Sequence, residues 1–291
     1  MTKAAYSDGA LTSADALTLH YRDYPATTEA GAKRPPLLCI PGLTRNCRDF
    51  EPIAEAFAGD RRVIAIDLRG RGQSDYARDS ASYVPLQYVA DVTSLLDQVG
   101  LERVVAIGTS LGGIVIMLLA MTAPGRIAGA VLNDIGPEVE AAGLARIRDY
   151  VGQGRSFPTW MHAARGLREQ GGVAYPDFAI SDWLRLAKRL MDIGPGGRVA
   201  FDYDMRIAEP LNRPEGTAQF DMWPAFRALS GRPVLAVRGD LSDILSATTL
   251  ERMARELEGL ETVTVPRVGH APTLEEPMAL RAIAALLAKS A

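Results

Sequence analysis

The segment Gly108-Thr109-Ser110-Leu111-Gly112 carries the strongest chemical signal in this sequence. It follows the apolar run Val104 to Ile107 and opens a second apolar stretch at Leu111. A serine at the tip of a sharp turn between strand and helix has a strained backbone and an exposed hydroxyl group. Small residues are needed two positions before and after it, because strand and helix approach closely there. The pattern therefore predicts Ser110 as a nucleophile.

A serine hydroxyl is a poor nucleophile until a neighbouring base accepts its proton, and the chain offers three histidines. His20 lies in an early alternating segment, far from the end of the sheet where such chemistry occurs. His162 lies in a predicted insertion and could at most line a pocket. His270 follows the last predicted strand and precedes the final helix, at the same sheet edge as the Ser110 turn. We therefore predict His270 as the general base.

The base in turn requires a carboxylate that fixes its tautomer and stabilises the imidazolium. The segment Leu235 to Leu245 leaves a buried strand and carries two candidates, Asp240 and Asp243. We favour Asp243, because the loop lies beyond the end of the sheet at that residue. Asp240 is expected to stabilise the turn or the edge of the site. Asp134 is a third option, because the strand before it also ends at the catalytic edge. The order Ser, Asp, His along the chain is typical of one hydrolase constellation.

An oxyanion intermediate requires hydrogen-bond donors, which we expect from two backbone N–H groups. The first belongs to Leu111, at the beginning of a helix. The second is expected in the loop after Leu37 to Ile40, where Pro41 has no N–H and Gly42 lets the backbone turn, so Leu43 is our choice. Arg45 is expected either near the mouth of the pocket or as a solvated loop charge.

The elements that position these residues follow from the alternation of short apolar runs with longer helical patterns, which is typical of βαβ units and a mostly parallel sheet. Strands are predicted at 17–24, 37–40, 63–66, 104–107, 129–132, 234–237 and 261–265. Helices are predicted at 85–99, 111–121, 182–191, 247–257 and 275–287.

The alternation of predicted strands and helices is interrupted between about 136 and 223, where the chain becomes rich in Arg, Gly, Trp and Tyr. We predict a helical lid over residues 136–223, inserted into a core formed by 1–135 and 224–291. The alternative is a run of surface helices without a gating role. Trp160 and Tyr203 are the predicted substrate-binding residues in this insertion, although aromatic residues more often pack in a core.

Composition excludes several classes of protein. The 291 residues are 47% hydrophobic and 23% charged, as in soluble globular enzymes, and the net charge of −3 gives no reason to expect nucleic acid as a partner. No apolar run is long enough for a membrane span, and the N-terminal residues lack the apolar region of a secretory signal. The two cysteines, Cys39 and Cys47, form no disulfide framework, so we expect a cytoplasmic protein.

Three motifs together resemble the α/β-hydrolase fold family. Asp67 to Ser74 matches the D-x-x-G-x-G-x-S turn of that family, Gly108 to Gly112 matches its nucleophile turn, and Gly269-His270 matches its histidine loop. The resemblance implies a mostly parallel sheet of about eight strands, flanked by helices, with a helical lid inserted after the sixth strand. In relatives with R-G-x-x-S-D-x-L, similar to Arg238 to Leu245, the acid falls at the position of Asp243.

One departure concerns the oxyanion loop, where many relatives have His-Gly and this chain has Pro41-Gly42. The donor at Leu43 should survive this change, although the hydrogen bonding of the loop will differ. Haloalkane dehalogenases and epoxide hydrolases look similar but place Asp at the nucleophile turn. Ser110 argues against both chemistries.

These observations predict a hydrolase that cleaves a small carboxylic ester or lactone through an acyl-enzyme intermediate. No metal-ligand spacing occurs, so neither a metal nor an organic cofactor is expected. Two alternatives stay open: hydrolysis of a carbon–carbon bond in a vinylogous diketone, and a non-catalytic ligand-binding protein on the same scaffold. The sequence leaves open the acyl length and the oligomeric state, a homo-oligomer included.

Overall fold

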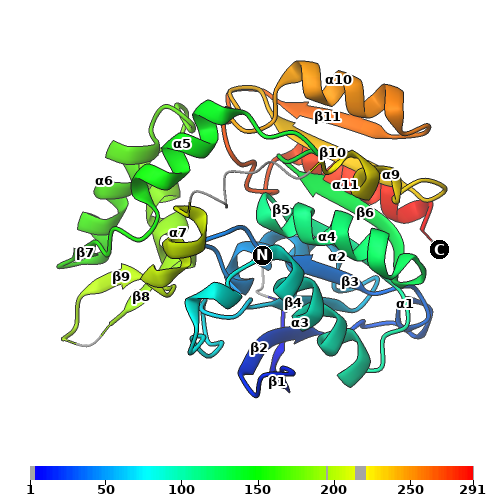
Figure 1. Cartoon of the computed structure of the whole chain (residues 1–291), viewed down its shortest axis with the longest axis horizontal. Coiled ribbons are helices and arrows are strands. Elements are labelled where there is room, and N and C mark those ends of the chain that lie inside the picture. The colour runs from blue at the N-terminus through cyan, green and yellow to red at the C-terminus, as the bar shows by residue number, and fades with distance from the viewer. Residues whose placement is uncertain (1–3, 195, 214–220, 291) are drawn as a thin grey trace.

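An eight-stranded sheet forms the centre of the computed structural model, which describes residues 4–194, 196–213 and 221–290 (Figure 1). The strand order is β1-β2-β4-β3-β5-β6-β10-β11, antiparallel from β1 to β4 and parallel across the rest. The strands are β1 (Ser7–Thr12), β2 (Thr18–Tyr24), β3 (Leu37–Ile40), β4 (Val63–Ile66), β5 (Val104–Thr109), β6 (Ile127–Asn133), β10 (Val234–Gly239) and β11 (Glu261–Val265). The mostly parallel sheet agrees with the sequence prediction, which missed only the edge strand β1.

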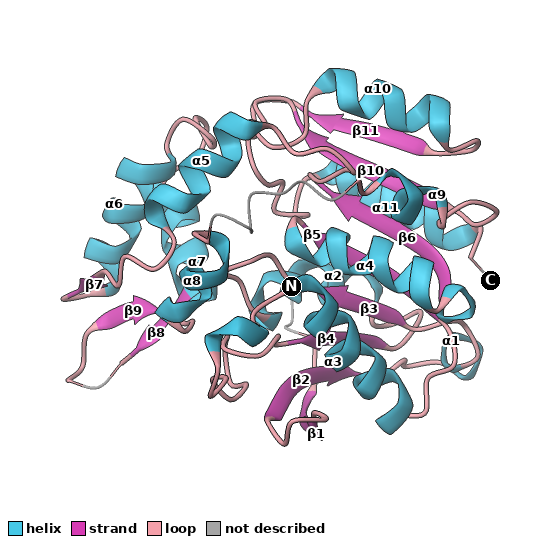
Figure 2. Ribbon diagram, viewed as in Figure 1, coloured by secondary structure: helices cyan, strands magenta, loops and turns pink. Residues whose placement is uncertain are grey.

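Helices cover both faces of this sheet, with α3 and α4 in front of it in Figure 2. The helices that accompany the sheet are α1 (Glu29–Ala32), α2 (Glu51–Phe57), α3 (Pro85–Gln98), α4 (Leu111–Thr122), α9 (Trp223–Arg227), α10 (Ala247–Glu256) and α11 (Pro277–Ala288). Short 3-10 turns occur at Cys47–Phe50, Ser80–Ser82, Pro124–Arg126 and Met205–Ile207. Apolar residues of α3, α4, α9 and α10 belong to one core cluster, and those of α2 and α11 belong to the other.

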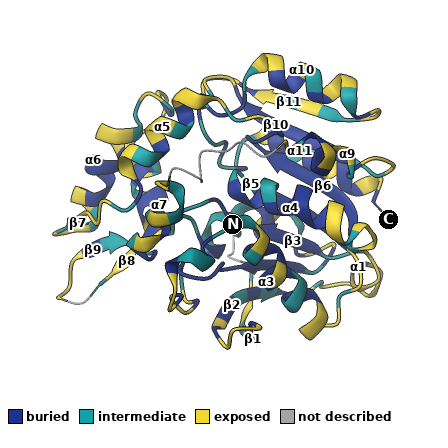
Figure 3. Cartoon of the chain, in the orientation of Figure 1, coloured by how far each residue is buried: buried dark blue, intermediate teal, exposed yellow. Residues whose placement is uncertain are grey.

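The strands β3 and β4 are apolar at every position because both of their faces are buried. In β3, Leu38 and Ile40 belong to the first core cluster, whereas Leu37 and Cys39 belong to the second. All four side chains are fully buried, and the central strands are dark blue along their length in Figure 3. The alternation of side chains along a strand thus divides one apolar run between two helical layers.

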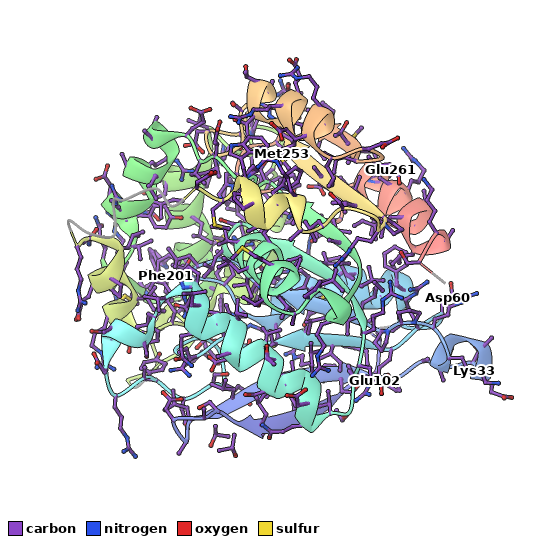
Figure 4. The ribbon with its side chains drawn as sticks, turned by 45° about the vertical axis from the view of Figure 1, so that its right-hand side comes forward. Lys33, Asp60, Glu102, Phe201, Met253 and Glu261 are labelled. Atoms are coloured by element: carbon purple, nitrogen blue, oxygen red, sulfur yellow. The ribbon has the colours of Figure 1, made fainter. Side chains whose placement is uncertain are left out.

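The parallel strands place their carboxyl ends at one edge of the sheet. Lys33, Asp60 and Glu102 lie just before β3, β4 and β5, and Glu261 begins β11. Figure 4 shows these residues on the right-hand side of the molecule, whereas Phe201 of the insertion lies on the left. The loops that follow the strands therefore open toward the insertion.

The segment between β6 and β10 contains helices and a small second sheet. Its helices are α5 (Ala141–Tyr150), α6 (Trp160–Gly171), α7 (Ile180–Leu190) and α8 (Ala208–Leu211). Its strands β7 (Ser156–Phe157), β8 (Met191–Ile193) and β9 (Val199–Phe201) form an antiparallel sheet in the order β7-β9-β8. This sheet was not predicted from the sequence, because its strands have only two or three residues each and no buried apolar run.

The predicted insertion, 136–223, ends at Trp223, which is the first residue of α9. Residues 195 and 214–220 of that range lie outside the described residues. Among the helices that the structure describes, none has the length and apolar character needed to cross a bilayer.

Candidate active site

Ser110 lies at the turn between β5 and α4, with a backbone φ of 52° and ψ of −115°. Such a conformation is costly for a residue other than glycine, and it is retained where the surrounding structure enforces it. The two flanking glycines allow the close approach: a methyl group on Gly112 would lie 2.0 Å from the carbonyl oxygen of Ile40, and one on Gly108 would lie 2.4 Å from the carbonyl carbon of Gly112. The turn therefore has the strained geometry that the sequence predicts.

The structure brings Ser110 and His270 together, although 160 positions separate them in the chain. His270 lies in the loop between β11 and α11, and its Nε2 is 2.9 Å from Oγ of Ser110. Its Nδ1 is 2.7 Å from Oδ2 of Asp134. The side chain of His270 is 9% exposed and that of Asp134 is fully buried. A hydroxyl, an imidazole and a carboxylate thus form one continuous hydrogen-bonded chain.

The carboxylate that contacts His270 is not the one that the sequence favoured. Asp243 forms a two-point ion pair with Arg146 of α5, at 2.5 Å to Nε and 2.8 Å to Nη2, and 37% of its side chain is exposed. These hydrogen bonds from Arg146 lower the pKa of Asp243. Asp240 is exposed as well, with Arg238 as its nearest cation at 3.9 Å. The preference for Asp243 is therefore wrong, and the third option, Asp134, contacts the imidazole.

The loop after β10 explains why Asp134 and not Asp243 faces His270. Asp134 directly follows β6, and its N–H donates to the carbonyl of Val237 at 2.7 Å. Its carboxylate accepts hydrogen bonds from the N–H of Gly239 at 2.8 Å and from the hydroxyl of Ser242 at 2.6 Å. The Ser242 hydroxyl also accepts from the amides two and three residues later, so the loop curls around Asp134. Asp243 then points away, toward α5.

Asn133, which the sequence analysis did not single out, ties the two loops together. Its side-chain amide donates to the hydroxyl of Thr109 at 3.0 Å and to the carbonyl of Pro272 at 2.9 Å. The backbone carbonyl of Asn133 accepts from the N–H of Ser110 at 3.0 Å. A polar residue at the end of the apolar strand β6 was the available signal for this role.

The loop after β3 carries the expected oxyanion donor Leu43, which lines the pocket at Ser110. Leu111 is the first residue of α4, where an N–H has no partner within the helix. The carbonyl of Leu43 accepts from Nε of Arg71 at 2.8 Å, and Nη1 of Arg71 donates to the carbonyl of Arg69 and to the hydroxyl of Tyr88. Arg71 is fully buried, and among the described residues no carboxylate lies within ion-pair distance of it.

A pocket opens beside Ser110 and His270, between the core loops and the insertion. Residues 42–45, 49, 50, 109, 110, 147, 150, 189 and 270–274 line it. The insertion contributes Ile147 and Tyr150 of α5 and Arg189 of α7. These three residues were not predicted, because nothing in the sequence fixes how the helices of the insertion face the core.

The two aromatic residues predicted to bind substrate do not line this pocket. Trp160 begins α6 and packs, partly buried, against the second core cluster. Tyr203 is 3% exposed in the first core cluster, and its hydroxyl accepts from the N–H of Gly152 at 3.2 Å. Both are packing residues of the insertion, which was the alternative interpretation of these aromatic side chains.

The polar groups of the pocket are held by partners around its walls. Arg45 forms a two-point ion pair with Asp49, at 2.5 and 3.0 Å. Burial opposes the charge of Arg45, but the Asp49 carboxylate outweighs it and raises the pKa of the guanidinium. Arg189 is paired with Glu275. Tyr175 lies outside the pocket lining. Burial raises its pKa to about 12, so it is a neutral phenol that donates to the carbonyl of the lining residue Ala271 at 2.7 Å.

In the part of the chain that the structure describes, one group of potential metal ligands lies outside the pocket, formed by His20, Cys47 and Asp67. The Asp67 carboxylate already accepts from Nδ1 of His20 at 2.7 Å and from the N–H groups of Cys47 and Gln73. Nε2 of His20 lies 2.9 Å from Asp8. These hydrogen bonds explain the group as a buried clasp between β2 and the turn after β4.

A central parallel sheet, a strained serine turn after β5 and a histidine loop before the last helix define the α/β-hydrolase fold. A model of the alpha/beta hydrolase family matches residues 37–283, and the chain belongs to this family. An alpha/beta hydrolase from Novosphingobium aromaticivorans, known from its crystal structure, is similar over 99% of this chain and 100% of its own, with 58% identity and a TM-score of 0.93.

Two enzymes with assigned activities are also similar to this chain. The 3-hydroxybutyrate-oligomer hydrolase of Cupriavidus necator is 34% identical over 83% of this chain and 84% of its own length. The 2-(acetamidomethylene)succinate hydrolase of Mesorhizobium japonicum is 27% identical over 81% of each. The family and these relatives identify a hydrolase and leave the substrate class to be determined.

Proposed function

We propose that this protein is a serine hydrolase that cleaves small carboxylic esters through an acyl-enzyme intermediate. The observation that carries the proposal is the chain of hydrogen bonds from Ser110 through His270 to the buried Asp134, at 2.9 and 2.7 Å. This is the arrangement in which a base activates a hydroxyl and a carboxylate orients the base.

Ser110, His270 and Asp134 each have a distinct task. Oγ of Ser110 attacks the carbonyl carbon of the ester while Nε2 of His270 accepts its proton. The imidazolium then protonates the leaving alkoxide, and a water molecule activated by His270 releases the acid and restores the serine. Asp134 keeps the proton of the imidazole on Nδ1 and stabilises the transient positive charge.

The negative charge of the tetrahedral intermediate needs donors that are in place before the reaction begins. We assign this task to the N–H groups of Leu43 and Leu111. Their support is that the first residue lines the pocket and the second begins the helix after the nucleophile. One such donor typically contributes about 2.7–4 kcal/mol to the stability of the transition state.

We assign the role of a lid to the segment from α5 to α8. Its support is that Ile147, Tyr150 and Arg189 of this segment line the pocket at Ser110. The loop after β3 fastens α7, because Asn46 and Arg48 both donate to the carbonyl of Arg189, at 2.9 and 3.0 Å. The lid thereby contributes side chains to the substrate site as well as covering it.

The relative from Cupriavidus necator suggests the first substrate to test, because its name specifies 3-hydroxybutyrate oligomers. The experiment is stopped-flow acylation with p-nitrophenyl acetate, followed by turnover of a 3-hydroxybutyrate dimer, in wild type and Ser110→Ala. We expect a burst and turnover in wild type and neither in the variant. A wild-type protein without burst or turnover, indistinguishable from Ser110→Ala, would indicate a ligand-binding protein. A vinylogous diketone turned over far faster than any ester would instead indicate carbon–carbon bond hydrolysis.

A further inference from the structure

We propose that Arg45 binds a free carboxylate on the substrate, so that the enzyme prefers esters that carry this group a few atoms from the scissile bond. This inference rests on the proposed ester hydrolysis and adds a class of substrate to it. The sequence allowed two positions for Arg45, one near the mouth of the pocket and one in solvent.

The side chain of Arg45 borders the nucleophile. The N–H of Arg45 donates to the carbonyl of Gly42 at 3.1 Å, and this turn brings the side chain back over the oxyanion loop. A methyl group built on Gly42 would lie 3.3 Å from Cγ of Arg45 and 3.7 Å from Cβ of Ser110. Both side chains therefore border the same point in the pocket, and both line it.

The guanidinium of Arg45 has more hydrogen-bond donors than its partner Asp49 uses. Asp49 accepts from Nε and Nη2, which holds the guanidinium plane in one orientation. Among the described residues, none accepts a hydrogen bond from Nη1, and 25% of the Arg45 side chain is exposed, so this donor is available to a substrate. A guanidinium that one carboxylate has already oriented loses little freedom when it binds a second anion.

The other charged groups of the pocket do not oppose an anion. The pocket is lined by two arginines, Arg45 and Arg189, and by one carboxylate, Asp49, which faces Nε and Nη2 of Arg45. Glu275, the partner of Arg189, is absent from the lining of this pocket. A carboxylate on the substrate could therefore bind Nη1 of Arg45. The guanidinium of Arg189, from the lid segment, also lines the pocket. An ester without this carboxylate would leave Nη1 of Arg45 without a partner from the substrate.

The test uses a matched pair of substrates, the 3-hydroxybutyrate dimer as the free acid and as the terminal carboxamide, which has similar shape and no charge. We expect wild type to have the higher kcat/KM for the acid at pH 7.5. In Arg45→Gln this preference should fall about tenfold or more, because a charged hydrogen bond is lost, and Arg45→Lys should restore part of it. Arg252→Gln is the matched control, because Arg252 also has a carboxylate four residues away but lies on α10.

A second measurement separates this inference from the proposed ester hydrolysis. Binding of the acid and of the carboxamide to Ser110→Ala, measured by calorimetry, requires no turnover. We expect tighter binding of the acid, and loss of that difference when Arg45→Gln is added. Equal preference in wild type and Arg45→Gln, in either measurement, would overturn the role of Arg45. A wild type that turns over neither substrate would overturn ester hydrolysis, and the calorimetry would then decide the role of Arg45 alone.

Discussion

Oδ2 of Asp134 lies 2.7 Å from Nδ1 of His270, and the same oxygen accepts the hydroxyl hydrogen of Ser242 at 2.6 Å. The carboxylate at the end of β6 therefore contacts the imidazole, a role that was expected for a carboxylate in the loop after β10. That loop contributes the hydroxyl of Ser242 and the N–H of Gly239, which hold Asp134 in place. The acid and its supports thus come from two neighbouring strands.

The first prediction distinguishes the two aspartates. Asp134→Asn should lower kcat about 10³- to 10⁴-fold, because an amide cannot hold the imidazole in the required tautomer. Asp243→Asn should stay within a few-fold of wild type, because its partner Arg146 lies outside the hydrogen-bonded chain. Steady-state kinetics on one ester, with thermal melts to confirm folding, measure both. A large loss of kcat in Asp243→Asn with normal kcat in Asp134→Asn would reverse the assignment.

The second prediction concerns the serine turn. Gly112→Ala should lower the free energy of unfolding by about 3 kcal/mol or more, because the added methyl group would lie 2.0 Å from the backbone oxygen of Ile40 and no side-chain rotation can relieve the contact. Gly125→Ala is the control, since a methyl group at Gly125 meets no atom within 4 Å. Denaturant unfolding should place that variant within about 0.5 kcal/mol of wild type. Equal stability of the two variants would contradict the close packing of α4 on β3.

The sequence was sufficient for the parts of the molecule that burial fixes. The strands β3, β4 and β11 begin and end at the predicted residues. For β3 and β4 the reason is that an apolar run buried on both faces has few alternative structures. Ser110 could be found from its turn. His270 could be found because, of three histidines, it alone follows the last strand of the sheet.

The carboxylate and the pocket depended on contacts that a sequence does not reveal. The strands β6 and β10 end at the same edge of the sheet, so Asp134 and Asp243 were both placed near the histidine. The hydrogen bonds of Ser242 decide which carboxylate turns inward. The residues that the insertion contributes to the pocket depend on how helices α5 and α7 pack, which amphipathic pattern alone does not determine.

The third prediction assigns a positioning role to Arg71, which donates to the carbonyl of Leu43 in the oxyanion loop. Arg71→Met should lower kcat about tenfold or more with a smaller change in KM, because a displaced loop weakens stabilisation of the transition state more than substrate binding. Arg69→Met is the control: Arg69 is equally buried, but its partners are Asp15 and Asp91. That variant should lose stability while the folded fraction keeps its kcat. Parallel losses of kcat in both variants would assign Arg71 a structural role only.

The fourth prediction concerns the clasp formed by His20. Burial disfavours the charged imidazole, but the carboxylates of Asp67 and Asp8 outweigh this effect and raise the pKa of His20 in the folded protein. A raised pKa means that protonation stabilises the fold. The contribution is complete below about pH 6.5, the ordinary value for histidine, and is lost as the pH rises through the folded pKa.

The measurement is the free energy of unfolding of wild type and His20→Gln at intervals from pH 6 to pH 9. Wild type should lose stability relative to the variant as the pH rises through this range. Ionisable groups other than His20 are common to both proteins, and burial raises the pKa of the neighbouring Cys47 thiol above this range. A difference between the two proteins that stays constant with pH would show that His20 is neutral in the clasp. An uncharged imidazole has a single N–H, so it would donate to only one of the two carboxylates, Asp67 or Asp8.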